Sequence, residues 1–216
     1  MKSLKQYWNE TYKSPNLKIT YDNWLNKYDE YLTNEGDLII DLGCGIGNNS
    51  LYLFEKGILP VACDISEEAL HTLRERLPSL PTLCLDMTQG LPFENKSAHV
   101  LIADLCLHYF DEETTLNVIK DIHRVMKPDG IVLCRLNSIN EVNNLGPVKQ
   151  SDDRYLFENE GIYRRLFDRA EIDRFFDKTM WELVHAEEYE MDRYTRKKML
   201  WEIAIKPRQH DQASIL

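Results

Sequence analysis

One stretch decides the fold of this chain: Leu38-Ile39-Ile40-Asp41-Leu42-Gly43-Cys44-Gly45-Ile46-Gly47-Asn48-Asn49. It opens with three apolar residues in a row, which indicate a strand covered on both faces, as in a parallel sheet. Three alternate glycines follow, and glycine adopts the backbone angles that a tight turn into a helix requires. The stretch therefore predicts a strand, a turn and a helix, with a turn backbone that a nucleotide-like ligand can approach closely.

The length and composition of the chain favour a single globular domain. The chain has 216 residues, of which 43% are hydrophobic and 29% are charged, enough to bury a substantial core. We expect the domain to span residues 1–207, followed by a flexible tail at 208–216. No apolar run reaches the roughly 18 residues that a bilayer-spanning helix needs, and the first residues lack the apolar core of a secretory signal. We therefore expect a cytoplasmic protein with no membrane partner.

Charge and cysteine usage exclude several classes of protein. The formal net charge is −10, whereas nucleic-acid-binding proteins normally present a basic face, so we expect no nucleic-acid partner. The one locally basic segment, residues 193–198, is interpreted as a solvated turn between strands. None of the five cysteines belongs to a CxxC pair, so we expect small buried side chains and neither a metal site nor disulfides.

Apolar patterns and turn signals predict strands and helices that alternate along most of the chain, which is typical of a doubly wound α/β fold. The expected strands are 38–42, 58–63, 82–85, 99–103, 131–136, 181–189 and 199–205. The expected helices are 21–32, 48–56, 66–78, one capped by Asp111 and one opened by Asp168. No period persists over residues 137–165, so we interpret this segment as a long loop on the substrate side.

Residues 1–36 are rich in aromatic side chains and are interpreted as a helical cap. The helix expected at 21–32 carries Trp24 and Tyr28 on one apolar face, and we expect that face to pack on the edge of the domain. The earlier segment, residues 7–12, contains Tyr7, Trp8 and Tyr12. Two interpretations of it stay open: packing at the domain edge, or a lid whose rings exclude water from a bound cofactor.

Four expected strands are each followed by an aspartate. Asp41, Asp64, Asp86 and Asp104 come at the carboxyl ends of successive strands, the edge of the sheet at which open α/β folds bind ligands. Asp64 follows Asp41 at nearly the interval at which an acid can accept hydrogen bonds from the ribose hydroxyls of an adenosine. The row of acids therefore predicts an adenosine-binding site.

Two classes of cofactor compete for this site. Dinucleotide-binding turns have the pattern GxGxxG and place a pyrophosphate at the helix N-terminus. This chain instead has an acid two positions before the first of three alternate glycines, and such an acid suits a cation and repels a pyrophosphate. S-Adenosylmethionine, which has a positive amino group and a sulfonium beside its adenosine, is the natural candidate.

At this point the chain resembles the class I S-adenosylmethionine-dependent methyltransferases. The resemblance covers residues 38–136 and rests on Asp41-Leu42-Gly43-Cys44-Gly45-Ile46-Gly47, Asp64, Asp86-Met87 and Lys127-Pro128-Asp129-Gly130. It implies a Rossmann-like, doubly wound, mostly parallel seven-stranded sheet with helices on both faces and a last antiparallel strand. Residues 7–9, 107–110 and 135–138 further resemble bacterial small-molecule methyltransferases of the thiopurine or tellurite-resistance type.

The resemblance implies a role for each matching residue. Asp41 would order the turn and the methionine amino group, while Gly43 and Gly45 would let the backbone approach the cofactor. Asp64 would hold the ribose hydroxyls and Ile65 would pack on adenine. The remaining cofactor contacts would come from Asp86 and Met87 at adenine, from Asp104 and Leu105 at the methionine moiety, and from Trp8, Cys44 and Asn49.

Candidates for the acceptor side follow the fourth and fifth strands. His108 lies four residues beyond Asp104, in the loop after the fourth strand, and is the candidate general base. In the alternative interpretation, His108 only caps that loop or packs within it. We expect Tyr109, Arg135 and Asn137 to line the acceptor pocket, although Arg135 could equally form a structural ion pair. Nothing in the sequence specifies the acceptor atom, whether S, N, O or a metalloid, or an oligomeric state.

Departures from related patterns favour a small-molecule acceptor. The chain has no Asn-Pro-Pro-Tyr after the fourth strand and no Pro-Cys nucleophile, two motifs that mark methyltransferases acting on nucleic acids. It also has no double-acid hairpin, which marks methyltransferases acting on protein arginine. Two alternatives stay open: a non-catalytic S-adenosylmethionine-binding regulatory module, and an NAD-dependent oxidoreductase, which the position of Asp41 disfavours.

Overall fold

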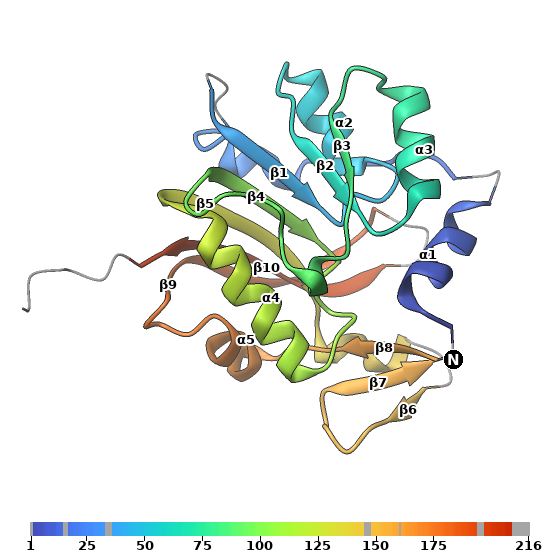
Figure 1. Cartoon of the computed structure of the whole chain (residues 1–216). Helices are drawn as coiled ribbons and strands as arrows, with labels where there is room; N and C mark the ends of the chain where they lie inside the picture. Colours follow the sequence, from blue (N-terminus) through green and yellow to red (C-terminus); the bar gives the residue numbers. More distant parts are fainter. Residues whose placement is uncertain are drawn as a thin grey trace, which may run out of the picture.

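A seven-stranded sheet forms the centre of the protein (Figure 1). The computed structural model describes residues 2–14, 17–32, 36–144, 148–159, 161–193 and 197–208. The strand order is β3-β2-β1-β4-β5-β10-β9, in which β1 to β5 are parallel and β10 is antiparallel to both neighbours. The predicted fold class is confirmed. The strands are β1 (Leu38–Leu42), β2 (Val61–Asp64), β3 (Thr82–Cys84), β4 (Ala98–Asp104), β5 (Met126–Asn137), β9 (Trp181–Met191) and β10 (Lys198–Pro207).

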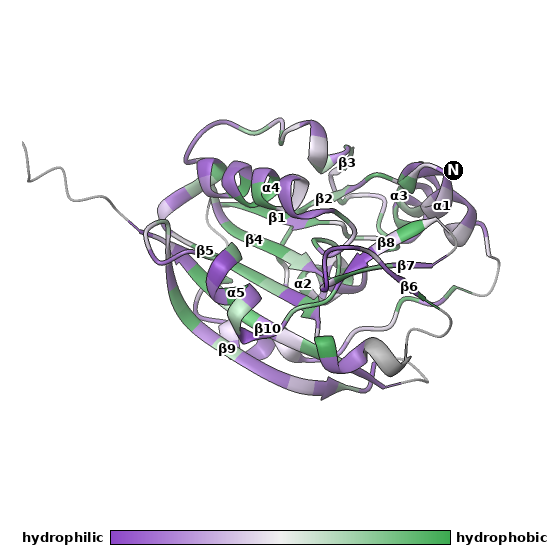
Figure 2. Ribbon diagram, turned by 90° about the horizontal axis from the view of Figure 1, so that it is seen from below, coloured by the Kyte–Doolittle hydropathy of each residue, from purple (hydrophilic) through white to green (hydrophobic). Residues whose placement is uncertain are grey.

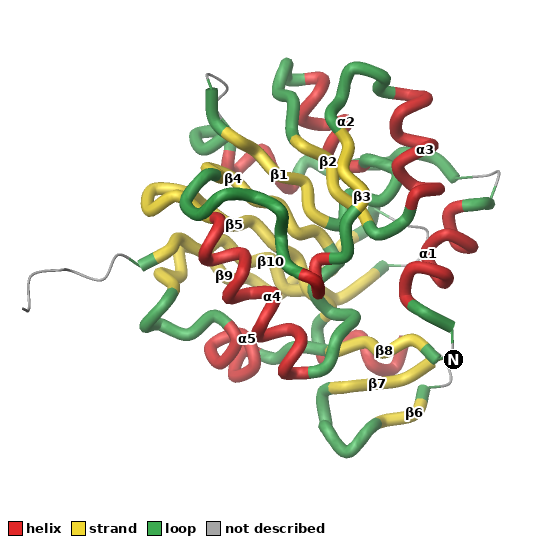
Figure 3. The backbone as a smooth tube through the Cα atoms, viewed as in Figure 1, coloured by secondary structure: helices red, strands yellow, loops and turns green. Residues whose placement is uncertain are grey.

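Helices cover both faces of this sheet (Figure 3). One face packs on α4 (Glu112–Val125) and α5 (Arg169–Phe175). The other packs on α2 (Asn48–Glu55) and on the 3-10 helix η1 (Trp24–Tyr28), and α3 (Glu67–Arg76) lies over β2. The central strands are accordingly hydrophobic along their length (Figure 2), because apolar side chains from alternate positions enter the cores on opposite faces.

The helices begin where the capping residues predict. The Ser66 hydroxyl accepts a hydrogen bond from the N–H of Ala69 at the start of α3. Asp111 caps α4 and Asp168 caps α5, each by accepting the N–H three residues later. Such caps satisfy backbone donors that have no partner inside the helix. No helix in the described part of the chain is long and apolar enough to span a bilayer.

Two predictions are wrong: the helix expected at residues 21–32 and the burial of all five cysteines. Residues 21–32 form only η1 and turns, not an amphipathic α-helix. Trp24 and Tyr28 are buried as expected, but their polar tips bond to Asn49 and Glu202, so tertiary contacts hold this segment. Four cysteines are buried as predicted, whereas Cys84 is exposed.

The segment 137–165 is not the long loop that the sequence predicts. It contains the 3-10 helix η3 (Ile139–Asn144) and an antiparallel sheet of β6 (Lys149–Gln150), β7 (Leu156–Asn159) and β8 (Ile162–Arg165). Strands this short leave too few positions for a hydrophobic period to be recognised. The fully buried Arg165 on β8 pairs with Asp153 in the β6–β7 connection and with Glu171 on α5, and the second pair holds the sheet to the rest of the protein. The predicted tail lies outside the described residues except for Arg208.

We expect Arg165→Ala to lower the free energy of unfolding by about 3 kcal/mol, because it leaves the buried Glu171 carboxylate with one cation fewer. The control is Arg169→Ala, which removes an exposed pair with Asp173 and should cost less than about 1 kcal/mol. Urea unfolding at pH 7 measures both values. Equal losses in the two variants would show that the Arg165 cluster does not stabilise the fold.

Candidate functional site

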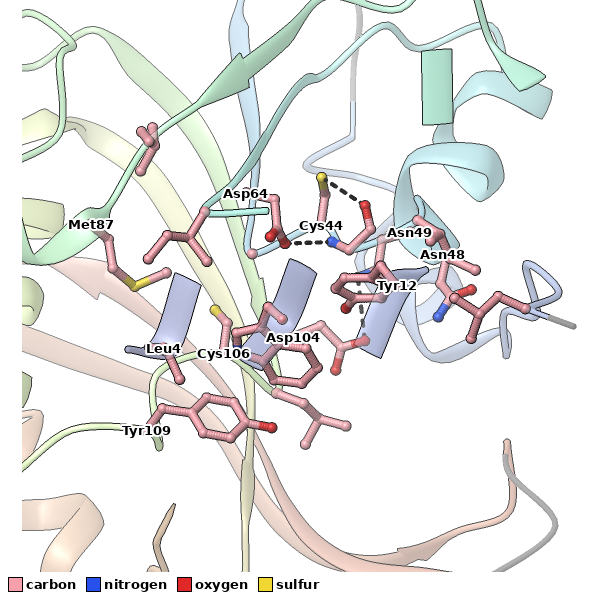
Figure 4. Close-up of a pocket in the computed structure, with 18 of the residues that line it drawn as sticks. Leu4, Tyr12, Cys44, Asn48, Asn49, Asp64, Met87, Asp104, Cys106 and Tyr109 are labelled. Carbon is pink, nitrogen blue, oxygen red and sulfur yellow. Dashed lines mark hydrogen bonds between the residues drawn. The ribbon is translucent and has the colours of Figure 1, made fainter. Parts of the chain in front are cut away.

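A cavity of about 300 Å³ lies at the carboxyl ends of the parallel strands (Figure 4). It is bounded by the glycine turn after β1, by the ends of β2, β3 and β4, and by the N-terminal helix α1 (Leu4–Tyr12). Of the predicted site residues, twelve line this cavity: Trp8, Gly43, Cys44, Gly45, Asn49, Asp64, Ile65, Asp86, Met87, Asp104, Leu105 and Tyr109. Their roles as ligands stay predictions, but the fold brings them to one place.

The glycine turn needs glycine at both Gly43 and Gly45. Both residues have positive φ angles, 70° and 56°, which side chains with a Cβ rarely adopt. A Cβ on Gly45 would lie 2.6 Å from the Tyr12 hydroxyl, and one on Gly43 would lie 2.3 Å from the Cβ of Cys106. The backbone of the turn therefore forms the cavity wall itself, as a closely approaching ligand requires.

Asp64 is fixed against this turn. One carboxylate oxygen accepts the N–H of Gly45 at 2.8 Å and the other accepts the N–H of Ser66 at 2.8 Å. The side chain is buried yet lines the cavity; burial raises its pKa, and the backbone hydrogen bonds oppose that rise. Each oxygen keeps a lone pair for a hydroxyl donor in the cavity.

Asp41 does not face the cavity, which corrects its predicted contact with the ligand. Its side chain is 1% exposed and accepts a hydrogen bond from the Ser50 hydroxyl at 2.6 Å, so it orders the turn from behind. Burial raises the pKa of Asp41 to about 7. The acidic groups that line the cavity are Asp64, Asp86 and Asp104.

Asp104 belongs to a buried network of two carboxylates and two guanidinium groups. Arg135 donates to it through Nε and Nη2, both at 2.8 Å, and Arg193 donates at 2.8 Å. Both arginines also bond Asp22. Burial alone would raise the pKa of Asp104, but the two positive charges outweigh it and hold that pKa well below its usual range. Arg193 is thus buried, not part of a solvated turn; residues 194–196 lie outside the described residues.

Three predictions for the acceptor side need correction, because His108, Arg135 and Asn137 do not line the cavity. Arg135 is fully buried in the network around Asp104, so the alternative of a structural ion pair holds. His108 is 1% exposed and packs against the Tyr109 ring at 4.4 Å, with Nε2 3.1 Å from the Asn137 amide. Burial lowers the pKa of His108 to about 3. This is the packing histidine of the alternative interpretation.

Helix α1 covers the cavity, which favours the lid interpretation of residues 7–12. The Trp8 ring stacks on Tyr12 with centroids 5.4 Å apart and meets Tyr109 edge-on at 5.3 Å. The hydroxyl of Ser66 donates a hydrogen bond to the Asn9 side chain at 2.8 Å, which ties α1 to the start of α3. Aromatic rings that pack in this way exclude water from the space beneath them.

Several lining residues were missed from the sequence, chiefly the basic side chains Lys18, Arg193 and Lys198. Arg193 and Lys198 reach the cavity only because β9 and β10 pair as a hairpin beside β5. No local pattern in the sequence marks such long-range placement. No group of three or more metal-ligating side chains occurs within the described ranges.

The fold and the site define a doubly wound α/β protein with a nucleotide-type cavity beside its first glycine turn. Residues 39–130 match the family model described as a methyltransferase domain. The predicted resemblance to class I S-adenosylmethionine-dependent methyltransferases is confirmed over this part of the chain, which is similar to a methyltransferase domain.

Relatives and solved structures agree with this placement. The chain is 32% identical over 146 residues to the putative methyltransferase YqeM of Bacillus subtilis, covering 66% of this chain and 57% of YqeM. The chain thus spans little more than half the length of that curated relative. An S-adenosylmethionine-dependent methyltransferase of Methanosarcina mazei matches with a TM-score of 0.68 at 20% identity, covering 83% of this chain and 96% of that one.

A Burkholderia thailandensis 1,6-didemethyltoxoflavin-N1-methyltransferase, solved with 1,6-didemethyltoxoflavin and S-adenosylhomocysteine bound, matches with a TM-score of 0.62 at 16% identity. The match covers 87% of this chain and 84% of that enzyme. At these identities, the two structures show that the fold is shared.

We expect Asp41→Asn to stabilise the protein increasingly as pH rises from 5 to 8. The pKa of Asp41 is raised from 3.8 to about 7 in the folded state, so the folded state holds this proton more tightly than the unfolded state does. Wild-type stability therefore falls from about pH 4 and levels off above about pH 7, whereas the neutral variant escapes this loss. Between pH 5 and pH 8 this loss is about 2.6 kcal/mol. Since about 1 kcal/mol corresponds to 2–4 °C, the difference in Tm should grow by about 5–10 °C.

Thermal melts at both pH values measure this difference. The matched control is Asp173→Asn, which alters an exposed carboxylate and should show the same difference at both. A constant difference for Asp41→Asn would mean that Asp41 does not ionise in this range.

Proposed function

We propose that this protein binds S-adenosylmethionine and transfers its methyl group to a small-molecule acceptor. The observation that carries the proposal is the coupling of Asp64 to the glycine turn, because the N–H of Gly45 holds the carboxylate at the cavity wall. An acceptor-only group in that position suits the two ribose hydroxyls of an adenosine. We further propose that residues 1–207 act as one domain.

The other lining residues fit the same cofactor. Asp86 uses one oxygen to cap the short helix η2 (Met87–Gln89) and lines the cavity near Ile65 and Met87, where an adenine amine would need an acceptor. Asp104, which Arg135 and Arg193 hold in its ionised form, presents carboxylate oxygens as acceptors at the end of the cavity near Asn49, where an amino group would lie. The acidic lining disfavours a dinucleotide, whose pyrophosphate is negative.

Alignment is the contribution that this chain can make to the reaction. When bound, S-adenosylmethionine supplies a methyl group on a sulfonium, which is already activated toward a nucleophile. The rings of Trp8, Tyr12 and Tyr109 enclose the cavity and exclude water. Holding donor and acceptor in line can contribute up to about 7–11 kcal/mol. The buried His108 is not placed to take a proton from an acceptor in this cavity.

Size and charge support a small acceptor. The cavity is closed on one side by α1 and on another by the loop that carries Tyr109, so a macromolecule would have only restricted access. A net charge of −10 disfavours a nucleic-acid substrate. The Burkholderia thailandensis methyltransferase of similar fold was solved with 1,6-didemethyltoxoflavin bound.

The cysteines bear on the location of the protein in the cell. All five are free thiols, which suits a reducing compartment, and we propose the cytoplasm.

We expect S-adenosylhomocysteine at a hundred times its Kd to raise the Tm by about 5 °C or more, because a ligand that binds only the folded state stabilises it by about 2.7 kcal/mol at that excess. NAD at the same concentration should leave the Tm unchanged. A shift with NAD and none with S-adenosylhomocysteine would overturn the proposal.

The same assay tests Asp64. Asp64→Ala should abolish the shift with S-adenosylhomocysteine, and Asp64→Asn, which keeps one acceptor for the Gly45 N–H, should weaken it. The matched control is Asp173→Asn on the surface, which should keep the full shift. Unchanged shifts in both Asp64 variants would remove Asp64 from the site.

Methyl transfer itself separates an enzyme from a regulatory binding module. We expect incubation of the protein with deuteromethyl-labelled S-adenosylmethionine and a metabolite extract to yield a labelled small molecule, detected by mass spectrometry. A binding module would give a thermal shift but no labelled product.

A further inference from the structure

The indole of Trp24 contacts two of the side chains that hold Asp104. Its N–H donates a hydrogen bond to Oδ1 of Asn49 at 3.0 Å. The guanidinium carbon of Arg135 lies 4.4 Å from the centre of its ring. Both partners in turn bond the Asp104 carboxylate, Arg135 through two hydrogen bonds of 2.8 Å and Asn49 through one of 3.3 Å. One indole therefore reaches this carboxylate by two routes.

Trp24 itself lies behind the wall of the cavity. It is buried in the 3-10 helix η1 and is not among the residues that line the cavity. Asn49, at the start of α2, and Asp104, at the end of β4, both line it (Figure 4). An effect of Trp24 on a bound ligand therefore passes through side chains that the ligand can meet.

The hydrogen bond from Trp24 decides which way the Asn49 amide is turned. An indole N–H can only donate, so the amide presents its oxygen to Trp24 and its NH2 group to Asp104. The opposite orientation would bring the amide oxygen against the Asp104 carboxylate, and two acceptors repel each other. The indole N–H thus holds the amide in the one orientation that favours an ionised Asp104.

The two ends of this amide are held unequally. Its oxygen accepts from Trp24 at 3.0 Å, whereas its nitrogen donates to Asp104 at 3.3 Å, the longest of the hydrogen bonds that this carboxylate accepts from described donors. The shorter bond keeps the amide back from the carboxylate. A charged amino group is a stronger donor than an amide, so it can bond to the carboxylate on this side.

We propose that Trp24 is a positioning residue for the amino-acid end of the cofactor. It holds Asn49 and Arg135 in place, so that the carboxylate of Asp104 between them receives the amino group of S-adenosylmethionine. This inference rests on the proposed cofactor and deepens it, because it names the side chain that orients the amino-acid end. Trp24 acts only through its neighbours and does not touch the ligand.

Two ligands that differ only at the amino group measure this effect. One is S-adenosylhomocysteine, and the other is its deaminated analogue, in which hydrogen replaces the amino group. Both keep the adenosine and the carboxylate, so the ratio of their Kd values, measured by calorimetry, reports the amino group alone. We expect the wild-type protein to prefer S-adenosylhomocysteine by about tenfold or more, because a hydrogen bond to a charged group contributes roughly that factor.

Variants of Trp24 should reduce this preference. Trp24→Phe keeps a ring beside Arg135 but has no N–H, and we expect it to lower the preference about threefold or more, the effect of one neutral hydrogen bond. Trp24→Leu also removes the ring and should lower the preference further. The Kd for the deaminated analogue should stay within about twofold of the wild-type value in Trp24→Phe. This conservative variant decides alone if the larger change unfolds the protein.

The matched control is Tyr28→Phe. Tyr28 is buried in the same short helix and loses one hydrogen bond, to Glu202, which does not line the cavity. It should lower the Tm but leave the preference unchanged, since its effect on stability does not reach Asp104. A general loosening of η1 would instead reduce the preference equally in Tyr28→Phe and Trp24→Phe.

A double-mutant cycle tests the route through Asn49. Asn49→Ala should reduce the preference, and adding Trp24→Phe to it should change nothing further, because the N–H then has no amide to hold. Additive losses would show that the indole N–H acts by another route.

The remaining outcomes decide separate statements. No binding of either ligand to the wild-type protein would overturn the proposed cofactor and this inference with it. Binding of S-adenosylhomocysteine without a preference over the deaminated analogue would overturn the role of Asp104 at the amino group, while the proposed cofactor stands. A preference that is unchanged in both Trp24 variants, or reduced equally in Tyr28→Phe, would overturn the positioning role of Trp24.

Discussion

The network of Asp22, Arg135, Asp104 and Arg193 is the interaction on which the architecture of the site depends. Its four members come from separate parts of the chain: the segment before η1, the end of β5, the end of β4 and the β9–β10 connection. Each carboxylate bonds both arginines, so two negative and two positive charges balance, with Asp22 the one member that is partly exposed. Loss of one member would leave an uncompensated buried charge. The network thus joins the β9–β10 hairpin, through Arg193, to the end of β4 that borders the cavity, through Asp104.

Local patterns in the sequence predicted much of the fold and the side of the cavity that the glycine turn and the ends of β2, β3 and β4 form. The strand, turn and helix at residues 38–49 and the capping residues Ser66, Asp111 and Asp168 are encoded within a few positions of one another. The acids at the strand ends were also predictable, because parallel strands bring their carboxyl ends to one edge. Of these four acids, Asp41 alone points away from the cavity, because its carboxylate accepts a hydrogen bond from the Ser50 hydroxyl on α2, behind the turn.

The surroundings of the cavity near the ends of β4, β5 and β10 could not be predicted in the same way, because long-range contacts build them. One hydrogen bond joins the buried side chains of His108 and Asn137, and Arg135 pairs with two aspartates that are distant in the sequence. Arg193 and Lys198 enter through the pairing of β10 with β5. The strands of the small sheet are too short for a hydrophobic period. In each case the deciding partner lies far away in the sequence.

The hydrogen bond between Asn9 and Ser66 bears on how helix α1 can move. The Ser66 hydroxyl accepts from the first turn of α3 and at the same time donates to Asn9 on α1. Helix α1 can therefore detach without unwinding α3, since the cap survives when the bond to Asn9 breaks. The other side-chain contacts of α1 include the rings packed around Trp8, the long hydrogen bond from Arg164 to Tyr7 and the exposed pair of Lys13 with Glu68. Movement of α1 away from the cavity would break these weak contacts together with the bond to Asn9, while the core of the sheet stays intact.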